Sequence, residues 1–228
     1  MRKTATSPAP RPKKAGAFDF KAALARVADE PDSTFARILF AAETLFADRG
    51  YAAVGIRDIA AAVPINVSTL HFHWKNKAVL YEAICRYQAD LISRTLAASL
   101  EGEPITPARI DAAVQDIIRL LAEYPAIAPM VLKSASDQEF PELAGVKRFD
   151  THLFDGLAQR LRGVAAKGSL AREFPDLTFL TLYHAVVLLF ADSAPQKALL
   201  GASLYKDKKL QDRIGKFASR LVDQLTCD

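Results

Sequence analysis

The stretch 55–77 constrains the fold of this chain more than any other, because it has the pattern of two short helices joined by a tight turn. Ile56, Ile59 and Val63 recur at helical spacing, so the first helix would have one apolar face. Pro64 ends that helix, because proline has no N–H to donate and disfavours helix at the residue before it. A short amphipathic helix followed by a turn is therefore predicted.

The second helix of this stretch begins after the turn, where Asn66 or Ser68 can cap it. Leu70 is the inward anchor of this helix. The hydroxyl and imidazole groups of Thr69, His71 and His73 suit contacts with phosphate oxygens. Two short helices in this arrangement allow the second one to enter a DNA major groove. The stretch therefore predicts a helix-turn-helix at about residues 55–74.

A longer run of residues around this motif stands in a fixed order and spacing, namely Ala41-Ala42, Leu45-Phe46-Ala47, Gly50-Tyr51, Ile56-Arg57-Asp58-Ile59-Ala60, Thr69-Leu70, Phe72-His73-Trp74, Lys75-Asn76-Lys77 and Leu80. In this order the run resembles the tetracycline-repressor (TetR) family of bacterial transcription regulators. The resemblance covers roughly residues 34–82, about a fifth of the chain. It implies a ligand-responsive repressor that binds double-stranded DNA, at a palindromic operator, as a homodimer.

The same resemblance implies roles for individual side chains. Arg57 is the candidate for a base contact, and a bidentate arginine–guanine contact discriminates by about 1–3 kcal/mol. Phosphate contacts would come from hydroxyl, imidazole and ammonium groups at Thr69, His71, His73 and Lys77. Leu70, Phe72 and Trp74 would pack the domain, with Phe72 also a candidate for backbone contact. The full predicted DNA-binding set is Gly55, Arg57, Asn66, Val67, Ser68, Thr69, His71, Phe72, His73 and Lys77.

Four departures from the family pattern fall in the DNA-facing region. Pro64 stands where the turn usually has glycine, and His71 replaces a tyrosine. Val67-Ser68 replaces a common Lys-Gly, which removes one positive charge. Val54-Gly55 replaces Thr-Ser and removes a side-chain cap, at a cost of about 1 kcal/mol or less where glycine serves as the cap. We expect these changes to affect binding strength and sequence preference more than the fold.

The charge of the chain is concentrated at its N-terminus. The formal net charge is +4, with 30 basic and 26 acidic residues. Residues 1–17 hold five basic residues and no acid, so the remainder has 25 basic against 26 acidic residues, a net of −1. A near-neutral body argues against sequence-indifferent coating of DNA. Residues 1–17 are predicted to be a disordered basic arm, either a solvated tail or an arm that reaches phosphates or the minor groove.

The rest of the chain shows helical periodicity throughout and no strand alternation, so an all-α fold is predicted. It would have an N-terminal three-helix head containing the helix-turn-helix (residues 18–80) and a C-terminal helical bundle for ligand binding and dimerisation (residues 81–228). The expected helices are 18–29, 34–49, the two motif helices, 77–100, 107–123, 126–136, 146–164, 177–191 with Asp176 as its cap and Pro195 as its end, and 209–225.

The segment 177–191 is apolar nearly all round, so it must be buried on every face. At about 15 residues it is too short to span a membrane. The domain core and a partner subunit together could cover it. We therefore expect this helix and the helix 209–225 to pair with their copies in a four-helix dimer interface.

The C-terminal bundle is predicted to hold a small apolar or aromatic ligand between its helices. Aromatic and polarisable side chains on these helices are the candidates for contact, although aromatic residues at helical spacing more often form plain core. These candidates are Tyr124, Met130, Phe149, Phe154, Tyr183 and His184.

Neither catalysis nor metal binding has support in the sequence. The chain has no phosphate-binding glycine loop, and GxSxG, HExxH and CxxC are all absent. Cys85 and Cys227 lack metal or redox spacing, so no metal, cofactor or enzyme activity is predicted. The basic N-terminus lacks an apolar run after it, which predicts a cytoplasmic protein. The alternative is an all-helical small-molecule-binding protein or enzyme with a weakened DNA-binding head.

Overall fold

The structure is a computed structural model that describes residues 18–100, 106–136, 155–191 and 194–227. The basic arm 1–17 and the ligand candidates Phe149 and Phe154 lie outside the described residues. The described ranges contain helices and no strand, which confirms the all-α prediction. The helices are α1 (Phe20–Asp29), α2 (Thr34–Arg49), α3 (Ile56–Ala62), α4 (Val67–His73), α5 (Lys77–Leu100), α6 (Pro107–Glu123), α7 (Ile127–Ser136), α9 (Leu170–Glu173), α10 (Pro175–Leu189), α11 (Ala194–Leu200) and α12 (Lys208–Thr226), with a further helical segment at 155–164.

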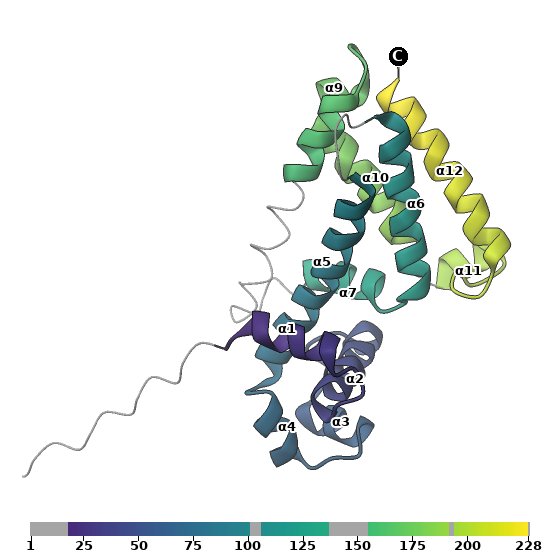
Figure 1. The fold of residues 1–228 in the computed structure, drawn as a ribbon. Coiled ribbons are helices and arrows are strands. Elements are labelled where there is room, and N and C mark those ends of the chain that lie inside the picture. The colour runs from purple at the N-terminus through teal and green to yellow at the C-terminus, as the bar shows by residue number, and fades with distance from the viewer. Residues whose placement is uncertain (1–17, 101–105, 137–154, 192–193, 228) are drawn as a thin grey trace, which may run out of the picture.

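The helices form two groups joined by α5 (Figure 1). Helices α1–α4 and the first turns of α5 form the head. The rest of α5 packs against α6, and α6 also packs against α12, so these helices form the bundle. Helix α7 lies between the two groups and contacts α2, α5 and α10. Both α5 and α7 therefore connect the bundle to the head.

The ends of α2 follow from local sequence. Ser33 Oγ accepts a hydrogen bond from the Ala36 amide at 3.3 Å, which caps the N-terminus of the helix. Gly50 ends α2 with φ of 82°, a left-handed value that favours glycine. These two residues fix the length of the helix on which the head is built.

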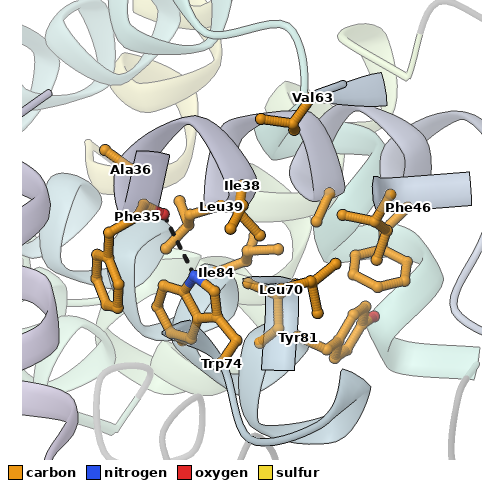
Figure 2. Packing of buried hydrophobic residues seen from close by; sticks show 14 of the residues in the cluster. Phe35, Ala36, Ile38, Leu39, Phe46, Val63, Leu70, Trp74, Tyr81 and Ile84 are labelled. Atoms are coloured by element: carbon orange, nitrogen blue, oxygen red, sulfur yellow. Dashed lines mark hydrogen bonds between the residues drawn. The ribbon is translucent and has the colours of Figure 1, made fainter. Parts of the chain in front are cut away.

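The core of the head is an aromatic and aliphatic cluster centred on Trp74 (Figure 2). Trp74 is fully buried, stacks on Phe35 at 4.3 Å between ring centroids, and donates from Nε1 to the Phe35 carbonyl at 3.2 Å. Tyr81 and Ile84 of α5 belong to the same cluster, so the core of the head extends past residue 80. The start of α5 is thus held by the head rather than by the bundle.

Helix α1 covers one side of the head, within the expected range 18–29. Asp19 Oδ1 accepts from the Ala22 amide at 3.0 Å and caps the helix. Phe18, just before the helix, packs on Trp74 with ring centroids 5.5 Å apart. Phe18 therefore anchors the start of α1 to the motif through Trp74.

A glycine brings α6 and α12 close together in the bundle. Gln115 Nε2 donates to the Gly215 carbonyl at 2.9 Å and to Ser219 Oγ at 3.0 Å. A Cβ atom at Gly215 would lie 2.6 Å from Gln115 Oε1, which is a clash. The absent side chain therefore lets the amide of Gln115 bridge the two helices.

The boundaries of α10 differ from the prediction. The helix begins at Pro175, with Phe174 at the N-cap, so Asp176 lies in the first turn and is not the cap. Proline suits the first turn because its missing N–H would have no partner there. The helix ends at Leu189, and Pro195 lies inside α11 instead of ending α10. Within the described ranges, no helix combines the length and apolar character needed to span a membrane.

Candidate DNA-binding surface and ligand pocket

The two motif helices, α3 and α4, pack against the head through a few apolar side chains. Ile59, Ala60 and Leu70 are buried, whereas Arg57 is exposed. The Ile65 amide donates to the Ala60 carbonyl at 3.0 Å, which closes the turn between the helices. The turn therefore forms with Pro64 in place of the expected glycine, and Arg57 is left accessible.

The N-terminus of α3 lacks the side-chain cap, as expected from Gly55, but keeps one of the two hydrogen bonds of a capping box. Gly55 occupies the N-cap and provides no side chain. However, Asp58 Oδ2 accepts a hydrogen bond from the Gly55 amide at 2.7 Å. In a capping box, this is the hydrogen bond from the backbone amide of the N-cap to the side chain of the third helical residue. It does not need a side chain at the N-cap, so glycine in place of the family's serine at position 55 leaves it intact.

Asn66 caps α4 and organises the polar groups at its start. Its Oδ1 accepts from the Thr69 amide at 2.7 Å, from Thr69 Oγ1 at 2.8 Å and from Ser68 Oγ at 2.6 Å. Because both hydroxyl protons point to Asn66, Ser68 and Thr69 must rotate before they can donate to a phosphate. The carboxamide therefore holds two residues of the predicted DNA-binding set, Ser68 and Thr69, in a fixed starting geometry.

The outward face of α4 carries Val67, Ser68, His71 and Phe72, all of them exposed. Phe72 is 84% exposed, so the expectation that it packs the head is wrong. Leu70 and Trp74 are one helical turn apart and share the inward side, which puts Phe72 on the opposite side. His71 Nδ1 lies 3.3 Å from the Lys75 carbonyl. The outward face is therefore partly apolar.

His73 is only half accessible and lies between two rings, those of Phe35 and Phe72, at centroid distances of 6.1 and 5.2 Å. Burial lowers the pKa of His73, and the nearby Arg26 lowers it further. Because the ordinary pKa of histidine is already below 7, the ring is neutral at physiological pH. Its contact with a phosphate would therefore be an uncharged hydrogen bond.

Lys77 is engaged inside the head. Its Nζ donates to the carbonyls of Tyr51 at 2.9 Å and Val54 at 3.1 Å, and lies 4.0 Å from the centre of the Tyr51 ring. These contacts tie the start of α5 to the segment just before α3. The geometry favours a structural role for Lys77 over the predicted phosphate contact, and Lys75, which the predicted set omitted, is the exposed lysine of this region.

The bundle encloses a cavity of about 170 Å³ between α5, α6, α7, the 155–164 segment and α10. Of the predicted ligand residues, Met130 and Tyr183 line it. Tyr124 and His184 are exposed and do not line it. Most lining side chains are aliphatic, namely Ala89, Ile92, Leu96, Leu100, Ile110, Ala113, Val114, Ile117, Leu121, Ile127, Val131, Leu157, Leu161, Leu182, Val186 and Val187.

A partly buried hydrogen bond connects the cavity wall to the head. Gln88 lines the cavity from α5, and its Nε2 donates to Glu43 Oε1 of α2 at 2.7 Å. Burial raises the pKa of Glu43, and the hydrogen bond from Gln88 partly offsets that effect. A polar pair thus spans the boundary between bundle and head.

Helix α7 makes a second connection between cavity and head. Met130 lines the cavity and also belongs to the apolar core of the head. One helical turn on, Lys133 Nζ donates to the carbonyls of Ala47 and Asp48 near the end of α2. A displacement of α7 by a bound molecule would therefore act directly on α2.

Comparison with known proteins agrees with this arrangement. Residues 38–84 match the family described as "Bacterial regulatory proteins, tetR family". This match covers the helix-turn-helix of the head and the first turns of α5, so the head is similar to the DNA-binding domain of that family. The matched residues include the whole of α3 and α4, and the function that this match supports is DNA-binding transcription regulation. No curated protein matches the chain in sequence.

Solved structures share the fold of this chain over most of its length. The ketosteroid transcriptional regulator KstR2 of Mycobacterium tuberculosis has a TM-score of 0.69 at 14% identity, with 86% of this chain and 97% of that chain covered. AibR in complex with isovaleryl coenzyme A and operator DNA has a TM-score of 0.66 at 19% identity, covering 85% and 98%. AmtR of Mycobacterium smegmatis has a TM-score of 0.63 at 20% identity, covering 84% and 86%.

Proposed function

We propose that this chain is a dimeric TetR-family repressor that releases a palindromic operator when a small apolar ligand enters the cavity. The observation that carries the proposal is the pair of connections from the cavity to α2, through Gln88 and through α7. The regulator AibR, which has the same fold, has been solved with both a ligand and operator DNA. The chain would act in the cytoplasm, where a bacterial operator is accessible.

The DNA contacts would come from the exposed side of the motif. Arg57 would read a base, whereas Thr69, His71 and His73 would set the register on phosphates. Asn66 would support these contacts as the cap of α4 rather than as a ligand of DNA. Two heads related by a two-fold axis would bind two half-sites of a palindrome.

The dimer would form through α10 and α12. Leu177 is 58% exposed on α10 and Phe217 is 55% exposed on α12, although both are large apolar side chains. A copy of the chain seated on these helices would bury them. The bundle from residue 81 onward would thus serve both dimerisation and ligand binding, with residues 18–80 as the DNA-binding domain and 1–17 as an arm.

The switch would act through the spacing of the heads. A ligand that occupies the cavity would push on Met130 and on the wall formed by α5, and both elements are held by the head. The ligand releases DNA only if it binds one head spacing better than the other. The fold supports such coupling because both connections end on α2.

A cavity-filling substitution tests this coupling without a known ligand. Ala113 is buried and lines the cavity, so Ala113→Leu places extra methyl groups where a ligand would lie. We expect the affinity for the operator to fall by about fivefold or more, measured by fluorescence anisotropy. Ala112→Leu, on the exposed side of the same helix, should leave the affinity unchanged. Wild-type affinity in a folded Ala113→Leu dimer would contradict the proposed coupling.

A further inference from the structure

The lining of the cavity contains a single charged side chain among the residues that the structure describes. Gln88, Cys85 and Tyr183 are its uncharged polar members, and the only ionised one is Arg160. A cation at the edge of an otherwise apolar cavity does not stabilise the apolar packing around it. Its position therefore bears on which ligand the cavity accepts.

Arg160 lies on the 155–164 segment between two residues that help to line the cavity, Leu157 and Leu161. Both leucines are at least partly buried, whereas Arg160 is exposed. Its side chain thus borders the cavity and solvent at the same time. None of the ion pairs formed within the described residues includes Arg160. The guanidinium is placed to meet the polar end of a ligand whose apolar part lies inside.

The charges near Arg160 also favour an anion. The range 155–173 carries four basic side chains, Arg160, Arg162, Lys167 and Arg172, against two acidic ones, Asp155 and Glu173. Two positive charges in excess on one short stretch attract anions and repel cations. This local balance contrasts with the near-neutral body of the chain.

The rest of the cavity lining offers little to a charged group. The Gln88 amide that lines it already donates to Glu43, and Glu43 is itself an acid. The remaining wall is aliphatic, apart from Cys85, Met130, Phe179 and Tyr183. A ligand with one charged end would therefore lie with its apolar part toward α5 and α6 and its charged end toward Arg160.

We propose that the ligand is an amphipathic anion, with an apolar chain or ring in the cavity and a carboxylate or phosphate paired with Arg160. This inference rests on the proposed function and specifies its ligand. A dry cavity of about 150 Å³ holds a six-carbon ring. The cavity of about 170 Å³ is slightly larger, so it would take an apolar part of about six to eight carbons. Arginine suits both head groups because its planar fork donates two parallel hydrogen bonds to carboxylate or phosphate oxygens.

A set of ligands with the same eight-carbon alkyl chain that differ only in the head group tests the proposal. Isothermal titration of the full-length protein at pH 7 would compare nonanoate, octyl phosphate, octanol and octylammonium. We expect the tighter of the two anions to bind about tenfold more strongly than octanol, and octylammonium to bind most weakly. The order of the two anions identifies the head group. Equal affinity for octanol and both anions would overturn the proposal, as would no binding of any of the four by a folded dimer.

Two variants of Arg160 and one variant of the neighbouring Arg162 test whether the preference for anions depends on Arg160. Arg160→Gln should remove the preference for anions, and Arg160→Glu should reverse it in favour of octylammonium. Arg162→Gln is the matched control, because Arg162 is exposed on the same segment but does not line the cavity. A preference for anions that survives Arg160→Glu would overturn the assignment.

The same titrations separate this proposal from the proposed function. Operator affinity measured with and without the tighter anion reports the switch, whereas the head-group preference reports the ligand class. An anion that binds through Arg160 but leaves operator affinity unchanged would support the ligand class and contradict the ligand-responsive repressor. Loss of operator affinity on adding the anion would support both.

Discussion

At the scale of single residues, the motif divides its aromatic side chains between two roles. Trp74 is buried and hydrogen-bonded, whereas Phe72, two positions earlier, is 84% exposed. The first supports the fold, and the second offers an apolar surface on the side of α4 that faces away from the head. Substitutions at the two positions should therefore have separable effects.

Replacement of Trp74 by phenylalanine should destabilise the head. Trp74→Phe removes the hydrogen bond to the Phe35 carbonyl and leaves space in a packed core, so we expect a loss of about 1–3 kcal/mol. Phe72→Ala should change the free energy of unfolding by less than about 0.5 kcal/mol, because its ring has few contacts to lose. Urea unfolding followed by circular dichroism measures both. Equal destabilisation by the two changes would contradict the division of roles.

The buried carboxyl of Glu43 should make stability depend on pH. Its folded-state pKa is raised by burial, so the folded protein binds this proton more tightly than the unfolded chain does. Ionisation of the Glu43 carboxyl therefore lowers the free energy of unfolding. This loss is absent below the unfolded pKa near 4.5 and grows as pH rises through the folded pKa. Glu43→Gln removes this charge and keeps an oxygen for Gln88 to donate to.

We therefore expect Glu43→Gln to be at least as stable as the wild type at pH 7, with a weaker fall in stability between pH 4.5 and pH 7. Urea unfolding across this range is the measurement. Glu30→Gln, at an exposed carboxyl, is the control and should keep the wild-type pH dependence. A Glu43→Gln variant that is less stable at pH 7 and has the same pH dependence would contradict the account.

At the scale of elements, the sequence predicts best those helices whose ends carry capping residues. Ser33 and Gly50 flank the predicted range 34–49 and cap α2 in the structure, and Asn66, one of the two predicted caps of the second motif helix, caps α4. The start of α10 was misplaced because Asp176 is also a good capping residue, and the choice between it and Pro175 depends on packing beyond the helix. Local signals thus locate an element better than they fix its first residue.

The candidate site was only partly open to sequence analysis. The i, i+4 spacing of Leu70 and Trp74 held the signal that Phe72 faces outward. The phosphate contact of Lys77 stays a prediction, and its two carbonyl partners come from the segment before α3, which no pattern near Lys77 reveals. The cavity is lined mainly by aliphatic stripes such as Ile110 and Ile117, and such a stripe looks the same whether it meets another helix or a void.

The exposed apolar faces of α10 and α12 give a prediction about assembly. Leu177→Glu places a charge on the proposed interface, so we expect the variant to sediment as a monomer at micromolar concentration, where the wild type sediments as a dimer. Leu199→Glu is the control, because Leu199 is 87% exposed on α11 and outside the proposed interface. A wild-type monomer, or a Leu177→Glu dimer, would contradict the interface.

At the scale of the whole molecule, the protein consists of two linked parts, the head and the bundle. The head presents α3 and α4, the bundle holds a cavity, and α5 and α7 belong to both. Two connections that end on the same helix, α2, allow a ligand in the bundle to change the setting of the head. The ligand class affects only which molecule operates the switch, whereas sequence-specific DNA binding is required for there to be a switch at all.

Selection of DNA fragments by the purified full-length protein tests this requirement most directly. Sheared genomic DNA from the host would be bound at moderate salt and sequenced, with Arg57→Ala as the parallel sample. We predict one enriched palindromic motif for the wild type, and weaker or altered enrichment for Arg57→Ala because a base contact is lost. Enrichment without any shared motif, from protein freed of bound small molecules, would contradict the account of a sequence-reading regulator.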